Sequence, residues 1–312
     1  MNAIVKPNNK NRVFNLKLYF DMLRQLKLIG FILGAITLII TVLPPLVILL
    51  RDTGGTERAI NTPSINGVTP VLWGYMFVGG AGLIYTAFSF LNKRNASDFY
   101  HSLPNTSLCI YLSLTAAVIT WLMATIVVNI LAAYFMYMII GVSINAIYLP
   151  YLFGYFMIGT LLVASAASIA VCITGTKLTN LVMTFLILFV PRFISMLLNI
   201  SIVENTAIIP FDQTGIIFNP FYNIAATPFS LISSVTSGSR YSPIEFLPGM
   251  LYSGILALLY FSFALLLYRV RRSETAGMSA PSRLLQHIYR CAITLPLLVI
   301  IPSAAFSGRV SM

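Results

Sequence analysis

Cysteine and histidine are scarce in this chain. Its three cysteines, Cys109, Cys172 and Cys291, lie inside or at the ends of apolar runs, and its two histidines, His101 and His287, lie between runs. A disulfide framework needs paired cysteines outside such runs, and a metal site needs a cluster of ligands. The sequence therefore predicts neither a disulfide scaffold nor a bound metal ion.

Charged residues are also few: 9% of the 312 residues are Asp, Glu, Lys or Arg, whereas 58% are hydrophobic. All eight acidic residues lie outside the long apolar runs. Carriers driven by protons or cations usually need carboxylates or histidines at the depth of the membrane. The sequence therefore disfavours a secondary carrier.

Enzyme motifs are missing as well. No Gly-x-x-x-x-Gly-Lys-Ser/Thr phosphate loop occurs, and Thr174-Gly-Thr-Lys177 lacks its spacing. The apolar runs hold no paired aspartates and no serine–histidine pair. We therefore expect no catalytic residue and no cofactor in this chain, so energy from ATP must come from another protein.

Long apolar runs dominate what is present. A run of about 20 apolar residues matches a helix that crosses the roughly 30 Å hydrocarbon layer of a bilayer. A soluble domain of this size has no room to bury several such helices, so we predict an all-α, polytopic transmembrane helical bundle. Six runs qualify, and a weaker seventh covers Cys291–Phe306; the six are Leu28–Leu50, Val71–Leu91, Leu108–Ile140, Ala146–Ile173, Leu181–Ile200 and Pro248–Tyr268. Residues 28–268 then form a six-span domain, and residues 269–312 a basic cytoplasmic segment with the seventh run.

Basic residues fix the expected orientation. With the N-terminus in the cytoplasm, most of the 19 basic residues lie on the cytoplasmic side, where the acids are Asp21, Asp98 and Glu274. This asymmetry follows the positive-inside rule. Anionic lipid of the inner leaflet accounts for the net charge of +11 without a nucleic-acid partner. We expect a multi-pass protein of a cell membrane with its N-terminus in the cytoplasm.

Residues 1–27 precede the first run and lack the cleavage site of a signal peptide. Within Val13–Leu28, apolar residues recur at spacings of three and four, and the opposite face carries Lys17, Asp21, Arg24 and Lys27. This pattern predicts an amphipathic helix that lies in the inner interface before the first span. A plain cytoplasmic extension of that span is the alternative.

Arg192 is the one ionisable residue deep in a predicted span, and it follows Pro191, which kinks a helix. An arginine at this depth is costly, so it is expected to face a cavity, to bind carbonyl groups of a neighbouring helix or to extend toward the interface. It is either a contact on a translocation path or a structural arginine near a helix break.

The segment between the second and third runs, residues 92–107, is the most distinctive local feature. Ser97 can cap a short helix that Pro104 would end, and Asp98 would favour its positive end. Phe99, Tyr100 and Leu103 would form one apolar edge. Such an edge either docks on a partner protein or rests on lipid headgroups.

Two cytoplasmic motifs resemble those of a known family. Arg94–Pro104, which contains Asp-Phe-Tyr-His-Ser-Leu-Pro from Asp98, resembles a stretch between the second and third spans of ABC exporter permeases from Gram-positive bacteria. Tyr268–Gly277 resembles the Y-x-x-R-x-S-E-x-A-G stretch that follows their sixth span. The resemblance covers nearly the whole chain in hydropathy, and these two motifs carry its specificity.

The resemblance implies a permease subunit of the type-two exporter class. Such a permease works with a separate ABC-type ATPase, which holds ATP and Mg, and it pairs with a second permease as a homo- or heterodimer. The family's short helix after the second span couples the ATPase to the bundle. The residues that the resemblance assigns to this coupling are Asp98, Phe99, Tyr100, His101 and Leu103 in the first motif and Arg272 and Glu274 in the second. The resemblance also implies re-entrant helices within residues 202–245.

One feature departs from the family pattern, because a six-span half-transporter would end near Gly277 and another apolar run follows here.

A second hypothesis is a membrane sensor or scaffold that transports nothing. A neighbouring reading frame that encodes a P-loop ATPase without spans of its own would favour the transporter.

Overall fold

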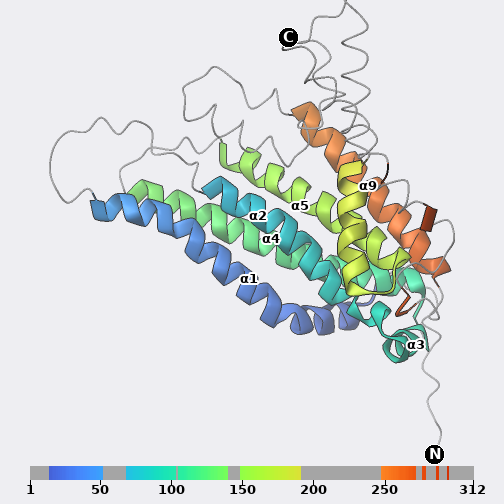
Figure 1. The fold of residues 1–312 in the computed structure, drawn as a ribbon. Helices are drawn as coiled ribbons and strands as arrows, with labels where there is room; N and C mark the ends of the chain where they lie inside the picture. The colour runs from blue at the N-terminus through green and yellow to red at the C-terminus, as the bar shows by residue number, and fades with distance from the viewer. Residues whose placement is uncertain are drawn as a thin grey trace, which may run out of the picture.

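The computed structural model describes residues 14–51, 68–102, 105–139, 148–190, 247–271, 276–278, 286–287 and 294. Within these ranges the regular elements are helices, without a strand, and the prediction of an all-α fold is confirmed for them. In chain order (Figure 1) they include α1 (Leu16–Arg51), α2 (Val68–Ala87), the 3-10 helix η3 (Ser89–Asn92), α3 (Arg94–Ser102), α4 (Ser107–Ile139), α5 (Tyr148–Ile173), the helix Lys177–Val190 and α9 (Leu247–Val270).

Four helices are long and apolar enough to cross a membrane: Leu16–Val47, Ser107–Ile139, Leu149–Ile173 and Met250–Val270. They match the first, third, fourth and sixth predicted runs. The second and fifth runs correspond to shorter apolar helices, Val71–Ala87 and Lys177–Val190. The end of the fifth run, the seventh run apart from Thr294, residues 1–13 and the segment 202–245 lie outside the described residues.

The helices start in two chemically different ways. Three follow a side chain whose oxygen accepts a backbone N–H of the first turn: Asn15 at 3.0 Å, Thr106 at 3.2 Å and Thr176 at 3.4 Å. These caps satisfy donors that have no partner inside the helix. Three others carry a proline near their first residue, where its missing N–H costs nothing: Pro70 in α2, Pro150 in α5 and Pro248 in α9.

Contacts between helices fix their directions. Asn15 of the α1 start binds Ser113, whereas Thr41 binds Asn129, so α1 and α4 run parallel. A Cβ on Gly80 of α2 would lie 3.0 Å from the Thr160 backbone oxygen of α5. These two helices approach closely because glycine leaves room for the neighbouring backbone.

Helices α2, α5 and α9 run opposite to α1 and α4. As a result, the start of α1, residues 88–102 and 105–107, residues 174–177 and the described residues 271 and 276–278 gather at one end of the bundle, which we call the basal end (Figure 1). These segments are the ones that the charge pattern assigned to one side of a membrane. The structure thus brings them together independently of the charge rule.

The bundle exposes much of its apolar surface. Most of α5 is buried, whereas α1 and α9 expose large side chains such as Phe31, Ile39, Leu258 and Leu259. A helix that is apolar all round needs apolar surroundings on every face. The surface of the bundle is therefore suited to a bilayer.

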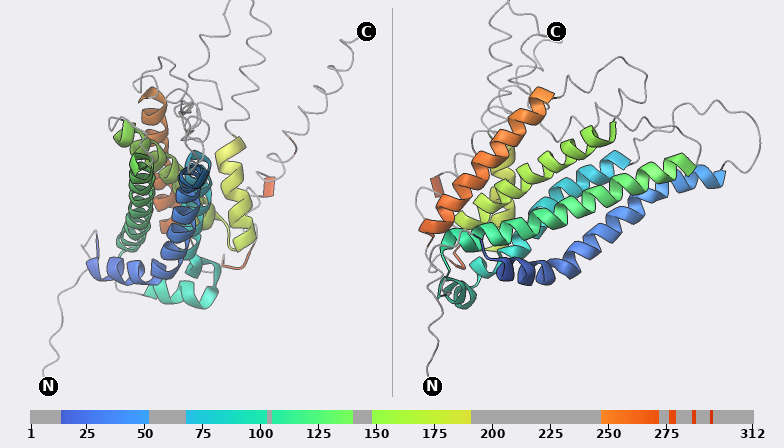
Figure 2. Two further views of the ribbon diagram at one scale, coloured as in Figure 1. Left: turned by 90° about the vertical axis from the view of Figure 1, so that its left-hand side faces the viewer. Right: turned by 180° about the vertical axis from the view of Figure 1, so that it is seen from behind.

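The first turns of α1 differ in direction from the rest of that helix. In Figure 2 they lie across the basal end, and the remainder then climbs along the bundle. The predicted amphipathic segment and the first apolar run are thus one continuous helix of 36 residues. At about 1.5 Å per residue it is far longer than a bilayer needs, and its first turns suit an interface.

Candidate functional site

The short helix α3 lies across the basal end beside the ends of the long helices (Figures 1 and 2). It follows η3 after a single extended residue, Lys93, whose N–H donates to Phe90 O at 3.1 Å. Most of its residues are polar, and Ala96 and Tyr100, one turn apart, pack against the buried core of the bundle. An element of this kind has one face for the bundle and one for its surroundings.

The two adjacent rings of α3 have different environments. The Tyr100 ring stacks on the buried Phe90 ring of η3, with centroids 3.9 Å apart and planes 22° apart. The Phe99 side chain is 62% exposed and meets Tyr100 edge to face, and Asp98 is also exposed. Tyr100 therefore holds α3 on the bundle, while Asp98 and Phe99 form its outer surface.

The predicted role of Ser97 as a helix cap is wrong. The helix begins three residues earlier, at Arg94, and the Ser97 N–H donates to Lys93 O at 2.9 Å within the first turn. The Ser97 side chain is fully buried against the bundle. A small residue is needed here because it lets the helix backbone approach its support closely.

A chain of aromatic contacts leads from α3 into the bundle. We call it the aromatic chain; it consists of Tyr100, Phe90, Phe88, Tyr111 and Tyr268. Phe88 lies 6.1 Å from Phe90, 5.6 Å from Tyr111 of α4 and 6.2 Å from Tyr268 of α9, measured between ring centroids. Such contacts are within the favourable range for aromatic pairs. Displacement of α3 would thus act on α4 and α9 through rigid side chains.

Arg271, directly after α9, joins the ends of three helices. Its Nη1 donates to Val171 O and, at 2.9 Å, to Thr174 O at the end of α5, and its Nη2 donates to Leu91 O of η3 at 2.7 Å. Carbonyl groups at helix ends have no intrahelical partner and carry partial negative charge. One guanidinium satisfies three of them.

Burial shapes the chemistry of this cation. Desolvation lowers the pKa of the Arg271 guanidinium below its ordinary value. An arginine nevertheless stays protonated in proteins, so the basal end holds a fixed positive charge among carbonyl oxygens. The sequence marked this residue only as one basic residue of the second motif.

The glycine that ends the second motif also binds the end of α5. Gly277 N–H donates to Gly175 O, and Gly175 N–H donates to Met278 O, both at 3.0 Å. Gly277 has φ of +86°, a conformation that other residues adopt only with strain. The segment after α9 is thus tied to the turn between α5 and the helix Lys177–Val190.

Asn180 is a residue that sequence analysis missed. Its Oδ1 accepts from the Thr174 hydroxyl, its Nδ2 lies 3.4 Å from Asn92 Oδ1, and its carbonyl accepts from the Tyr85 hydroxyl at 3.2 Å. It therefore links the helix Lys177–Val190 to η3 and α2. An asparagine at the edge of an apolar run gives no signal of this role, because its partners come from distant segments.

The remaining predicted site residues are placed only in part. His101 lies on α3, in its last turn. Leu103, Arg192, Arg272 and Glu274 lie outside the described residues. Cys109 and Cys172 are buried and carry no disulfide. In the described ranges no three His, Cys, Asp or Glu side chains lie close enough together to hold a metal ion.

No family model, curated protein or solved structure matches this chain.

Proposed function

We propose that this chain is the membrane-spanning permease subunit of an ATP-driven ABC exporter. Six spans would cross a bacterial plasma membrane with the basal end in the cytoplasm. A separate ATPase would hold ATP and Mg and dock on α3, and a second permease would complete the transporter. The resemblance of the two cytoplasmic motifs motivates the proposal.

The observation that supports it best is that one side of α3 packs on the bundle while the other side is exposed. The helix is held on the bundle by Tyr100 and presents Asp98 and Phe99 outward at the end of helices of membrane length. An exposed aromatic beside an acid on a firmly supported helix is suited to a groove on a partner protein. A helix that rested on lipid headgroups would have little need for rigid support behind it.

The contacts behind α3 support a role in transmission. The aromatic chain reaches α4 and α9, and Arg271 connects η3 to the ends of α5 and α9. Movement of a docked ATPase would therefore reach several helices at once. Closure of two ATPases on nucleotide could alternate the side to which the bundle opens.

Phe99 provides the sharpest test of this proposal. We expect Phe99→Ala to weaken ATPase binding by about 30-fold, because an aromatic anchor in a partner's groove is commonly worth about 2 kcal/mol. Complex yield and ATP turnover in proteoliposomes are the measurements. The bundle itself should stay folded, since the Phe99 side chain is largely exposed.

Phe20→Ala is the matched control. Phe20 is 61% exposed and lies edge to face with Tyr19, as Phe99 does with Tyr100, but it belongs to α1. ATPase binding should be normal in this variant. Equal binding by the Phe99 and Phe20 variants would show that α3 does not dock the ATPase, as expected for a sensor or scaffold.

A further inference from the structure

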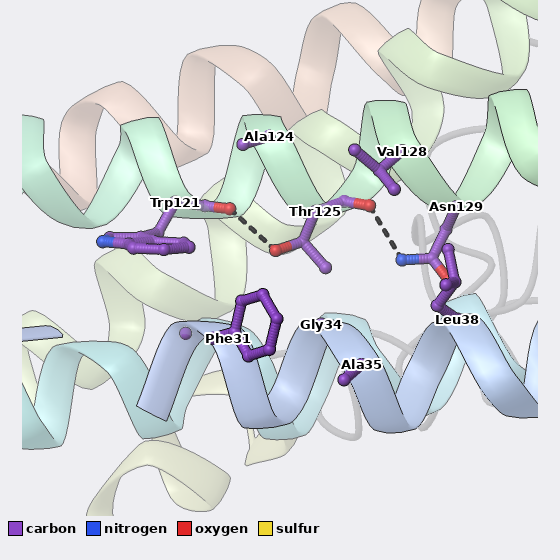
Figure 3. A pocket seen from close by; sticks show the side chains of 10 residues that line it. Phe31, Gly34, Ala35, Leu38, Trp121, Ala124, Thr125, Val128 and Asn129 are labelled. Atoms are coloured by element: carbon purple, nitrogen blue, oxygen red, sulfur yellow. Dashed lines mark hydrogen bonds between the residues drawn. The ribbon is translucent and has the colours of Figure 1, made fainter. Parts of the chain in front are cut away.

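A cavity opens on the flank of the bundle between α1 and α4, away from α3. Its volume is about 240 Å³, and it is lined by residues between Gly30 and Leu38 of α1 and between Trp121 and Asn129 of α4. Figure 3 shows Trp121, Thr125 and Asn129 pointing from α4 toward α1. Phe31 and Val128 at its edge are 68% and 53% exposed, so the cavity faces the surroundings of the bundle.

The polar groups of the cavity are already engaged. Trp121 Nε1 donates to Leu23 O at 3.3 Å, and the Thr125 hydroxyl donates to Trp121 O at 2.9 Å. Asn129 Nδ2 donates to Thr125 O at 2.8 Å, and its Oδ1 accepts from the Thr41 hydroxyl at 3.1 Å. The surface left for an occupant is therefore apolar.

Hydrocarbon is the occupant that this surface fits. An engineered apolar cavity of about 150 Å³ binds benzene, so the larger space here takes a segment of alkyl chain. In a bilayer an open apolar groove is bathed in such chains, and filling it restores dispersion contacts that an empty groove would lack.

Charge beside the groove selects the headgroup. Arg24 and Lys27 are exposed and precede Phe31 by seven and four residues, so they continue the helix stripe that lines the groove with Ala35. Asp21, one turn earlier, is exposed and offsets part of their charge. A lipid whose acyl chain lies in the groove would thus place its headgroup beside two cations and one acid.

We propose that the α1–α4 groove binds one acyl chain of an anionic phospholipid, with the lipid phosphate held by Arg24 and Lys27. The proposal needs the bundle to lie in a membrane but does not depend on export. A protein with no ATPase partner could bind the same lipid, so the two proposals fail separately.

Fluorescence quenching of Trp121 tests the site directly. The chain has two tryptophans, and Trp73→Phe leaves Trp121 as the sole tryptophan, which is excited selectively at the red edge of its absorption, while it keeps a ring beside Phe77. The full-length variant is placed in nanodiscs with phosphatidylglycerol or phosphatidylcholine that carries dibrominated acyl chains. Two cations and one acid leave about one net charge, so we expect phosphatidylglycerol to quench at about fivefold lower mole fraction.

Two sets of variants separate chain from headgroup. Arg24→Gln with Lys27→Gln should make the two lipids equal but preserve quenching. Ala124→Leu, at an exposed lining position, should reduce quenching by both lipids, and Ala35→Leu is the second variant for the same space. Gly82→Leu, where a Cβ meets nothing within 4 Å, is the control and should leave quenching unchanged.

Equal quenching by the two lipids before substitution would overturn the anionic assignment. Undiminished quenching in both leucine variants would overturn the groove as the binding site. If neither lipid quenched Trp121, another helix would cover the groove, and this result would also overturn the proposal.

Discussion

Arg271 illustrates how a single side chain can organise one end of a helical bundle. Its guanidinium contacts carbonyl groups of α5 and η3 while its backbone follows α9. The planar, five-donor geometry of arginine makes such multiple binding feasible, whereas a lysine ammonium is a point charge. The identity of this residue, and not only its charge, should therefore matter.

We expect Arg271→Met to lower the free energy of unfolding by about 3 kcal/mol. Hydrogen bonds to charged groups contribute about 1.5 to 3 kcal/mol each, and the desolvation cost of a buried guanidinium, which methionine does not have, offsets part of their sum. Arg271→Lys should lose roughly half as much, since it cannot reach all three carbonyls. Unfolding in mixed micelles with a denaturing detergent is the measurement. Arg269→Met, at an exposed neighbouring position, should be neutral, and equal losses at both positions would contradict the structural role.

Residue-level prediction from sequence succeeds for the exposure of Phe99 and fails for the contacts of Tyr100 and Ser97. The motif indicated that Phe99 would be exposed, and it is. The same pattern predicts that Tyr100 lies on the exposed edge beside Phe99. In the structure Tyr100 instead stacks on Phe90, which belongs to a separate element, η3, that apolar periodicity does not reveal. Ser97 was assigned to a cap because Ser favours that position, but close packing on the bundle determines its place.

At the scale of elements, α1 shows the limits of hydropathy. The sequence divided it into an amphipathic segment and a span, because the charged residues end near Leu28. The structure has one continuous helix, whose first turns contact α4 through Tyr19 and Thr120 at 2.9 Å. No residue near Leu28 breaks the helix. The amphipathic segment and the span therefore differ in what surrounds them and not in their backbone conformation.

The packing of α1 on α4 should depend on Gly30. A Cβ at this position would lie 2.7 Å from the Trp121 ring, which its bond to Leu23 O holds in place. We expect Gly30→Ala to lower the free energy of unfolding by about 1 to 3 kcal/mol, as is typical of overpacking. Thermal unfolding in detergent is the measurement.

Gly34→Ala is the control for that substitution. Its Cβ would meet Thr125 at 3.6 Å, an ordinary contact, so stability should be unchanged or slightly higher. If Gly30→Ala were as stable as Gly34→Ala, the close approach of α1 to α4 at Trp121 would be wrong.

At the scale of the whole molecule, the charge pattern and the fold agree on one point. The loops that carry the basic residues meet at the basal end through contacts such as Asn15–Asn105 and Asn180–Asn92. The sequence could assign these loops to one side because lysine and arginine are costly to translocate. It could not predict which of them touch, since that depends on helix order in space.

We expect the basal end to lie in the cytoplasm. Asn95→Cys on α3 is exposed and accessible to a thiol reagent, whereas Ser97 is buried and unsuitable. In a background with Cys291→Ser, an impermeant reagent should label Thr56→Cys and Ser237→Cys in intact cells and Asn95→Cys only after permeabilisation. Labelling of position 95 from outside would mean that the basal end lies outside the cell, where α3 could not contact a cytoplasmic ATPase.

Co-purification from the native host tests the central claim most directly. The full-length chain, extracted in mild detergent and identified with its partners by mass spectrometry, should bring with it a P-loop ATPase that has no membrane spans. Addition of ATP and Mg to the complex should give turnover, and the Phe99→Ala variant should yield less complex and therefore less turnover. Recovery of the intact chain without any P-loop protein would contradict the proposal that it is the permease of an ATP-driven exporter.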